Sequence, residues 1–398
     1  MIQAANRINH VKEYYFSLKL KEIAQLNQGK EKVLNLGIGN PDLSPSEETW
    51  TTLRESCNHP LSHGYQGYQG IPQLRSSFAR WYQNYFDVQL DETKEILPLM
   101  GSKEGIMMIS MAFLNPGDKV LIPDPGYPTY RSVTQLLGGE IMTYPLQEEN
   151  NWQPNLEQLE QENLEKVKIM WVNYPHMPTG ARGSKQLLQN LVDFARKHKI
   201  LIVNDNPYSF ILNEEPISIM NAKGARECAL ELNSLSKSHN MPGWRVGMIC
   251  GNQDLLEPVL KVKTNMDSGM FYPVQQAAIK ALSQGPEWYE SINKVYEKRR
   301  TKVYELLKLL SCRPTPDQSG MFVWAAIPGN YSDSYQMSDE ILKNTKVFIT
   351  PGAIFGQQGS KYIRISLCSS MTVLEEAIQR IKEHPMCTPE KKIIEKQD

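Results

Sequence analysis

The chain has 398 residues, and its 43 lysines and arginines almost balance its 44 aspartates and glutamates, which leaves a formal net charge of −1. Without a block of like charge, the sequence gives no electrostatic support for a nucleic-acid or anionic-membrane partner. The six cysteines lack the spacing of a metal site or a disulfide framework, and the longest apolar run, IMMISMAFL, is too short to span a bilayer. We therefore expect a protein of the reducing cytoplasm without a metal site.

Short apolar runs that predict strands follow one another through the first two thirds of the chain. They are EILPLM near residue 97, KVLIP near 121, KIMWV near 170, ILIVND near 202, ALELNSLS near 232 and VGMIC near 248. Most are separated by amphipathic helical patterns such as SKQLLQNLVDFARKHK at 184–199. Strands that alternate with helices indicate an α/β fold with a mostly parallel central sheet covered by helices.

The pattern changes near residue 285, where a long charged helical stretch leads to two further strand candidates, MFVWAAI and KYIRISL. This region predicts a smaller α+β domain. The first forty residues have no sheet partner nearby in the sequence, so we expect them to pack against it. The expected organisation is a large domain at 41–284 and a small domain formed by 1–40 and 285–398.

Three polar residues follow strand candidates: Asn173, Asp205 and Lys237. Each alone could be a cap or turn residue. Because ligands of open α/β sheets bind outside the carboxyl ends of the strands, the fold would bring these three side chains onto one rim.

The stretch MGSKEG (100–105) follows a strand candidate and precedes an apolar helix. Free amides at a helix N-terminus, with Ser102 and Lys103, would suit a phosphate, although a plain serine N-cap is the commoner use of such a sequence. LGIGNPD (36–42) lacks the third glycine of a dinucleotide fingerprint, so it is weak evidence for a nicotinamide dehydrogenase.

The stretch NSLSKSHNMPGWRVG (233–247) sets Lys237 between two serines and Arg245 beyond a tight turn. A lysine among neutral groups and near a second cation holds its proton less firmly, whereas the alternative is a solvated loop with ordinary charges. With Asp205 and a phosphate site on the same rim, these residues are what pyridoxal phosphate requires. The lysine forms a Schiff base, the carboxylate pairs with the pyridinium nitrogen, and cations hold the phosphate.

The segment SLSKSHNMPGWRVG also resembles the lysine signature of the class I/II, fold-type-I pyridoxal-phosphate aminotransferases. Other stretches resemble this family's motifs in the same order: LGIGNPD, YQGIPQLR, GSKEG, LNPGD, PDPGYPTY, YPHMPTG, NDNPYSF, KTNMDSGMF and YIRIS. Several are most similar to the LL-diaminopimelate and aspartate aminotransferase branches. The resemblance implies a fold-type-I transferase that moves an amino group from an α-amino acid to a 2-oxo acid by a ping-pong cycle.

By this resemblance, Lys237 would form the Schiff base and carry the proton. Asp205 would keep the pyridine nitrogen protonated, and Tyr208 would hydrogen-bond the phenolic oxygen of the cofactor. The remaining cofactor-binding positions would be Gly101, Ser102, Lys103, Tyr127, Asn173, Ser234 and Arg245, with Ser236 as a weaker candidate. In this set Tyr127 would stack on the ring, while Ser102, Lys103, Ser234 and Arg245 would hold the phosphate.

The resemblance further implies that Arg364 binds the substrate α-carboxylate as a bidentate fork and that Gly39 lies against the substrate. The alternative for Arg364 is an arginine on the exposed face of a strand. Tyr65 would reach the phosphate of a neighbouring subunit, so we expect a homodimer.

Two departures from the family pattern stand out. Met177 occupies the place of an asparagine that usually hydrogen-bonds the cofactor, and a thioether cannot donate a hydrogen bond. Either Tyr208 serves alone, or Asn173 or His176 replaces the missing donor; otherwise His176 is a loop histidine without a catalytic part. The second departure is the absence from 263–271 of the arginine that some aspartate aminotransferases supply from the partner subunit. A strong dicarboxylate preference by that means is therefore unsupported, unless Lys263 or another residue substitutes.

The sequence leaves alternatives open. One is a pyridoxal-phosphate β-lyase or another enzyme of the same fold, and another is a non-catalytic regulatory module that kept the fold. The amino donor is not indicated.

Overall fold

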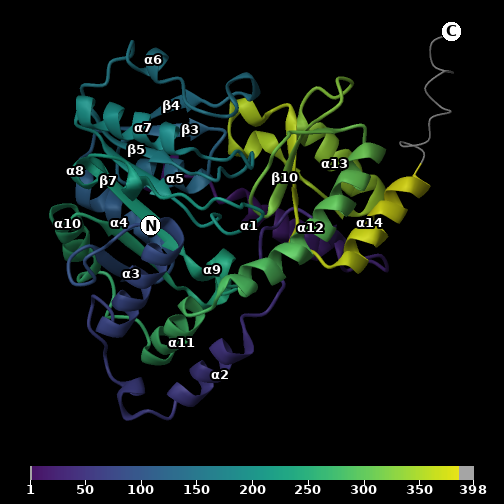
Figure 1. Cartoon of the computed structure of the whole chain (residues 1–398). Helices are drawn as coiled ribbons and strands as arrows, with labels where there is room; N and C mark the ends of the chain where they lie inside the picture. Colours follow the sequence, from purple (N-terminus) through teal and green to yellow (C-terminus); the bar gives the residue numbers. More distant parts are fainter. Residues whose placement is uncertain (1, 385–398) are drawn as a thin grey trace, which may run out of the picture.

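The computed structural model describes residues 2–384, and within them a seven-stranded sheet forms the centre of the larger part of the molecule (Figure 1). Its strand order is β2-β8-β7-β6-β5-β3-β4. The strands are β2 Ile96–Leu99, β3 Lys119–Asp124, β4 Glu140–Pro145, β5 Val167–Val172, β6 Leu201–Asp205, β7 Ala229–Ser234 and β8 Gly247–Gly251. Strands β3 to β7 pair in parallel, whereas β8 is antiparallel to both of its neighbours. The mostly parallel sheet predicted from the sequence is therefore confirmed.

Successive side chains of a strand point to opposite faces of the sheet, and here both faces are buried. On β5, Ile169 and Trp171 join one apolar cluster while Met170 and Val172 join another. Helices supply the opposing residues on each face. They are α3 Pro72–Phe86, α4 Ser102–Phe113, α5 Pro128–Leu136, α7 Lys185–His198, α10 Gln253–Lys263 and α11 Tyr272–Leu282. Continuous apolar strands are the expected consequence of a sheet that is covered on both sides.

Helix α7 illustrates why these segments form helices. The Ser184 side chain caps its first turn by accepting a hydrogen bond from the Leu187 amide, and the helix ends at Lys199 in the left-handed conformation. Its buried residues recur at helical spacing: Leu187, Leu188, Leu191, Val192, Phe194 and Ala195. This apolar stripe packs on the sheet and leaves the polar face in solvent.

A second, smaller sheet has four antiparallel strands in the order β12-β13-β10-β9. Its strands are β9 Arg313–Pro314, β10 Phe322–Ala326, β12 Thr350–Pro351 and β13 Tyr362–Ser366, and three helices accompany it: α12 Pro286–Leu309, α13 Ser334–Thr345 and α14 Met371–Glu383. The remaining helices are α1 Tyr15–Leu26, α2 Glu47–Ser56, α6 Leu156–Leu159, α8 Ala225–Cys228 and α9 Leu235–Ser238. Figure 1 shows α12 running from the large part of the molecule into this smaller part.

The N-terminal segment packs against the C-terminal region. Strand β1 (Leu34–Asn35) pairs in parallel with β11 (Val347–Phe348), and Ile23 of α1 lies in one apolar cluster with Phe348. The boundaries drawn at 40/41 and 284/285 remain a prediction. Residues 385–398, which that prediction assigns to the small domain, lie outside the described residues. Within 2–384, no helix is long and apolar enough to cross a membrane.

Candidate active site

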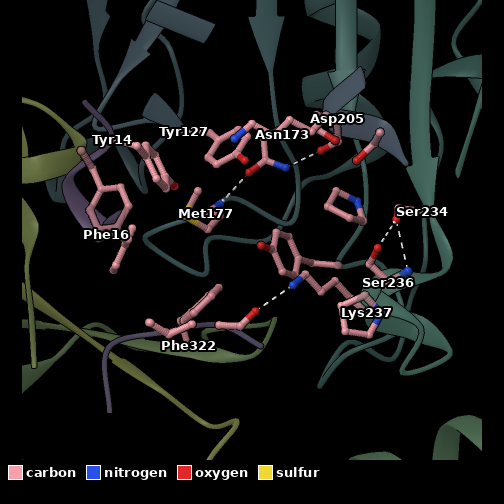
Figure 2. A pocket seen from close by; sticks show the side chains of 18 of the residues that line it. Tyr14, Phe16, Tyr127, Asn173, Met177, Asp205, Ser234, Ser236, Lys237 and Phe322 are labelled. Carbon is pink, nitrogen blue, oxygen red and sulfur yellow. Dashed lines mark hydrogen bonds between the residues drawn. The ribbon is translucent and has the colours of Figure 1, made fainter. Parts of the chain in front are cut away.

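A cavity of about 710 Å³ opens at the carboxyl ends of the parallel strands (Figure 2). Most of the site residues proposed from the sequence line it: Gly39, Ser102, Lys103, Tyr127, Asn173, Asp205, Tyr208, Ser234, Ser236, Lys237, Arg245 and Arg364. Its volume lies within the usual range for ligand sites of roughly 300–1,000 Å³. The rim predicted from the strand ends is therefore a single pocket.

Lys237 lies in the short helix α9, directly after β7. Ser234 begins this turn, because its hydroxyl accepts a hydrogen bond from the Ser236 amide. The Lys237 Nζ donates to the carbonyl oxygen of Gly39 at 2.7 Å. Burial lowers the pKa of Lys237 to about 8, and the nearby cations Arg364 and Arg245 act in the same direction. The amine therefore becomes neutral, and nucleophilic, at a much lower pH than an ordinary lysine.

Asp205 ends β6 and is buried. Its Oδ2 accepts a hydrogen bond from the Tyr130 hydroxyl at 2.9 Å, whereas its Oδ1 is buried without a partner. Burial raises the pKa of Asp205 to about 6, while the Tyr130 bond opposes that rise. A buried carboxylate oxygen that lacks a partner is costly unless a ligand donates to it. This oxygen suits the protonated nitrogen of a bound pyridine ring.

Both polar atoms of the Asn173 side chain make hydrogen bonds to backbone groups. Its oxygen accepts from the Met177 amide at 2.7 Å, and its nitrogen donates to the Asp205 carbonyl (Figure 2). His176 is buried outside the pocket lining and bonds Thr179 Oγ1 at 2.8 Å. Asn173 keeps a second amide hydrogen and lines the pocket, whereas His176 does not line it. Tyr208 does line the pocket, and burial raises the pKa of its hydroxyl, which keeps the proton available for donation.

The phosphate end of the pocket is formed around the start of α4. Gly101 is the N-cap with φ +88°, and no side chain caps the helix, so the Ser102 N-cap considered from the sequence is wrong. A Cβ atom on Gly101 would lie 2.1 Å from Nη2 of Arg245, so a glycine is needed for the guanidinium to approach. Free helix amides, Ser102 and Arg245 together fit a dianionic phosphate.

Arg364 comes from β13 and is buried, so the alternative of an exposed strand arginine is wrong. Its guanidinium lies 3.8 Å from the Phe322 ring centroid and 4.7 Å from that of Phe355. Nη2 donates to the Gly37 carbonyl at 2.8 Å, Nε has no partner, and no described carboxylate forms an ion pair with it. Burial lowers the pKa of Arg364 to about 10. A buried guanidinium without a counter-ion suits a ligand carboxylate.

Two residues considered from the sequence lie elsewhere. Tyr65 is 93% exposed and does not line this pocket. Lys263 is fully buried, and its Nζ lies 2.9 and 2.6 Å from the two carboxylate oxygens of Asp267. Lys263 does not line this pocket, and its charge is paired with that of Asp267.

Sequence reasoning missed several lining residues, most of them apolar: Tyr14, Phe16, Leu20, Ile38, Tyr130, Phe322 and Phe355. Tyr130 could have been found, since it lies three residues after Tyr127 at the start of a predicted helix. The aromatic run at 14–16 precedes α1 and matches no motif, so nothing in the sequence placed it at the pocket.

Oδ1 of Asp205, which accepts no hydrogen bond, fits the ring nitrogen of pyridoxal phosphate. The amine of Lys237 fits its aldehyde, and the amide-rich start of α4 fits its phosphate. Together with the sheet topology, they define a pyridoxal-phosphate enzyme of fold type I. The family model described as "Aminotransferase class I and II" matches residues 31–381, and the chain belongs to this family.

Individual relatives agree with this assignment. The chain is similar to the LL-diaminopimelate aminotransferases of Natranaerobius thermophilus (41% identical, covering 96% of this chain and 100% of the relative) and Maridesulfovibrio salexigens (41%, 95% and 98%). Among solved structures, substrate-bound BacF from Bacillus subtilis superposes with a TM-score of 0.92 at 34% identity, covering 96% of this chain and 98% of that one. The protein is thus a pyridoxal-phosphate-dependent aminotransferase whose substrates are amino acids and oxo acids, and the nicotinamide dehydrogenase alternative is excluded.

Proposed function

We propose that amino-group transfer proceeds by a ping-pong cycle in which Lys237 binds the cofactor and then carries the proton to and from the substrate Cα. The observation that carries this proposal is the presence of Lys237, Asp205 and Arg364 in one pocket, each with a group available to a ligand. The lowered pKa of Lys237 supports both of its roles, because a nucleophile and a base must be neutral at the working pH.

Asp205 Oδ1 would accept a hydrogen bond from the protonated ring nitrogen, and the buried Tyr130 would hold the other carboxylate oxygen in place. Bound pyridoxal phosphate supplies an electron sink for the negative charge that develops on the substrate Cα. In our proposal Tyr127 stacks on the ring and Tyr208 donates to its phenolic oxygen. Both line the pocket, and burial raises the pKa of each hydroxyl.

Four side chains would hold the phosphate: Ser102, Lys103, Ser234 and Arg245. Gly101 contributes by leaving room for the guanidinium, and Ser236 supports Ser234 through a hydroxyl–hydroxyl bond of 2.8 Å. Asn173 contributes indirectly, since its amide fixes the chain between Asp205 and Met177.

Arg364 would bind the α-carboxylate of the substrate through two parallel N–H groups. Gly39 lies beside this position, and a Cβ atom there would come within 2.2 Å of the Phe322 ring. The glycine thus lets the chain pass close to Phe322 while its carbonyl faces Lys237.

We further propose that the active unit is a homodimer to which Tyr65 contributes across the interface. Tyr65 lies 93% exposed among other exposed apolar side chains: Leu61, Tyr68, Met266 and Phe271. Gly269, with φ +87°, would place a Cβ atom 2.4 Å from the Gln66 carbonyl, so the two loops that carry these residues are in contact. Exposed apolar side chains on neighbouring loops are typical of an interface.

The relatives are named for LL-diaminopimelate, which makes this amino acid one candidate donor to test. A cytoplasmic location is part of the same proposal and is supported by free cysteines among the described residues: Cys57, Cys228, Cys250 and Cys368.

The proposal is tested by reducing the cofactor-loaded protein with borohydride and mapping the labelled peptide. We expect the label on Lys237 and none in Lys237→Ala. Single-turnover absorbance changes with a panel of amino acids then test the transfer itself. A label on another lysine, or no absorbance change with any amino acid, would refute the proposed function.

A further inference from the structure

Residues 37–42 contact two of the cations that line the pocket. The Gly37 carbonyl accepts a hydrogen bond from Nη2 of Arg364 at 2.8 Å. The Gly39 carbonyl accepts one from Nζ of Lys237 at 2.7 Å, and Figure 2 shows this bond as a dashed line from the Lys237 amine. We call residues 37–42 the glycine segment. Its path determines where the hydrogen-bond acceptor for the Lys237 amine lies.

The first half of the glycine segment is packed tightly against the smaller part of the molecule. A Cβ atom on Gly37 would lie 2.4 Å from the Phe348 ring. One on Gly39 would lie 2.2 Å from the Phe322 ring. The Thr350 hydroxyl also donates to the Gly37 carbonyl at 2.9 Å. The Gly39 carbonyl belongs to the following peptide group, so its direction depends on how the second half of the segment is held.

An ion pair holds the second half of the glycine segment. Both carboxylate oxygens of Asp42 accept hydrogen bonds from the Arg299 guanidinium, at 2.6 and 2.7 Å. The Arg299 side chain belongs to α12, is 5% exposed and does not line the pocket. Its Nη1 also donates to the Leu367 carbonyl at 3.0 Å, directly after the strand that carries Arg364. Because a bidentate pair fixes both distance and orientation, Arg299 places Asp42 relative to the pocket.

The acceptor at Gly39 acts on the Lys237 amine in both of its protonation states. A neutral amine that donates one N–H to this carbonyl has fewer directions open to its lone pair, which favours one line of attack. A protonated amine is stabilised by the carbonyl dipole against burial and against the neighbouring cations Arg245 and Arg364. The Cys368 thiol is the other titratable group that acts on the amine, and it supports the protonated form. Loss of the acceptor would therefore leave the amine less oriented and more easily deprotonated.

We propose that the Asp42–Arg299 pair positions the Lys237 amine. The pair acts through the Gly39 carbonyl, since neither of its members lines the pocket. The inference rests on the proposed function, which gives Lys237 its role as nucleophile and base. If the pair only stabilised the junction between the two parts of the molecule, its loss would lower the free energy of unfolding and leave the amine unchanged.

The pair is removed most cleanly from the arginine side. Arg299→Met replaces the buried guanidinium by an apolar group, and the Asp42 carboxylate, whose side chain is 33% exposed, remains hydrated. Arg300→Met is the matched control, because Arg300 is the next residue of α12 and donates to the Gln318 carbonyl at 3.1 Å instead. Asp42→Ala and the double variant complete a cycle. If the two residues act as one unit, the double variant should be no worse than the more affected single variant.

The first test measures the amine in the cofactor-free protein. The rate of pyridoxal phosphate capture is followed by stopped-flow absorbance over a pH series. In Arg299→Met we expect the maximal rate to fall about tenfold, because the amine is less well oriented. The midpoint should also move down by about one pH unit, because the protonated amine has lost an acceptor. Arg300→Met should match the parent protein in both quantities.

The second test uses the cofactor-loaded protein and the fastest donor in the panel of amino acids. Arg299→Met should lower the maximal rate of the half-reaction by about tenfold. The half-saturating concentration of the amino acid should change by less than about threefold, because Arg364 keeps its contact with Gly37.

An unchanged capture midpoint with an unchanged half-reaction rate overturns the inference, even if the variant unfolds at lower denaturant. Equal effects in Arg300→Met overturn it as well. If no amino acid reacts with the parent protein, the proposed function fails, and the capture midpoint alone decides whether the pair positions the amine.

Discussion

The sulfur of Met177 lies 3.2 Å from Nη1 of Arg364. A thioether accepts hydrogen bonds weakly and donates none, so this residue contacts Arg364, which would bind the substrate in our proposal, and has no donor for the cofactor's phenolic oxygen. His176 bonds Thr179 outside the pocket lining, and our proposal assigns the protein donor at that oxygen to Tyr208.

Introducing the missing donor should change the titration of the cofactor. A hydrogen bond to the phenolate offsets its negative charge and favours loss of the chromophore's proton. Met177→Asn should therefore lower the pKa of the visible absorbance band by about one unit. The measurement is a pH titration of the spectra of both proteins. An unchanged pKa would show that water or Tyr208 already satisfies the oxygen.

The lowered pKa of Lys237 predicts how the cofactor-free protein captures pyridoxal phosphate. Only the neutral amine attacks the aldehyde, so the capture rate should rise with pH and reach half its maximum near pH 8, the lowered pKa of Lys237. An ordinary lysine would be well under 1% neutral at that pH. Stopped-flow absorbance at a series of pH values gives the midpoint, and a midpoint above pH 10 would contradict the structure.

Asp205 and Tyr130 should differ in their effect on transfer. Asp205→Ala removes the partner of the ring nitrogen, and the variant should keep some cofactor. The activation free energy of the half-reaction should rise by several kcal/mol, which lowers its rate on the order of 10³-fold or more. Tyr130→Phe removes only the bond to the other carboxylate oxygen and should cost about tenfold. Near-normal turnover of Asp205→Ala would mean that another acid serves the nitrogen.

The two arginines of the pocket should separate kinetically. Arg364→Lys keeps the charge but loses the planar fork, so it should raise KM for amino acids by about tenfold or more while cofactor affinity changes little. Arg245→Lys should weaken cofactor binding and leave KM nearly unchanged once the protein is saturated. Equal loss of cofactor in both variants would contradict the role assigned to Arg364.

The buried pair of Lys263 and Asp267 should matter for stability. Lys263→Ala leaves a buried carboxylate without its cation and should lower the free energy of unfolding by about 3–5 kcal/mol. The matched control is Lys302→Ala, whose partner Glu305 is more exposed, and it should cost under about 1 kcal/mol. Denaturant unfolding measures both, and equal effects would show that burial adds nothing to this pair.

The sequence correctly predicted the strands whose apolar pattern reflects burial in the sheet. All six strand candidates of the large sheet became β2, β3, β5, β6, β7 and β8. The missed strand of this sheet, β4 at Glu140–Pro145, lies at its edge, where only Tyr144 is buried and no continuous apolar run forms. Edge strands give a weaker signal because a single neighbour and partial burial relax the choice of residue.

The same distinction separates the site residues that the sequence identified from those that it did not. Lys237, Asp205 and Arg364 could be identified because their chemistry demands particular residue types within recognisable motifs. Apolar lining residues such as Phe16 could not be identified, because Phe16 reaches the pocket through contacts with residues more than three hundred positions away, such as Arg364. Apolar residues at helical spacing indicate only that some face is buried, and the sequence does not say against what.

The pairing of β1 with β11 has a consequence for biosynthesis. Leu34 and Val347 are partners in the same two-stranded ladder, so one strand leaves the ribosome long before the other exists. At about 5–20 residues per second, the early strand waits roughly 15–60 s for its partner. The intervening sheet is able to fold during that interval, whereas the nascent amino terminus stays exposed to chaperones and proteases. Assembly of the substrate pocket is therefore the closing event of translation, because α1 reaches its position only when the last strands arrive.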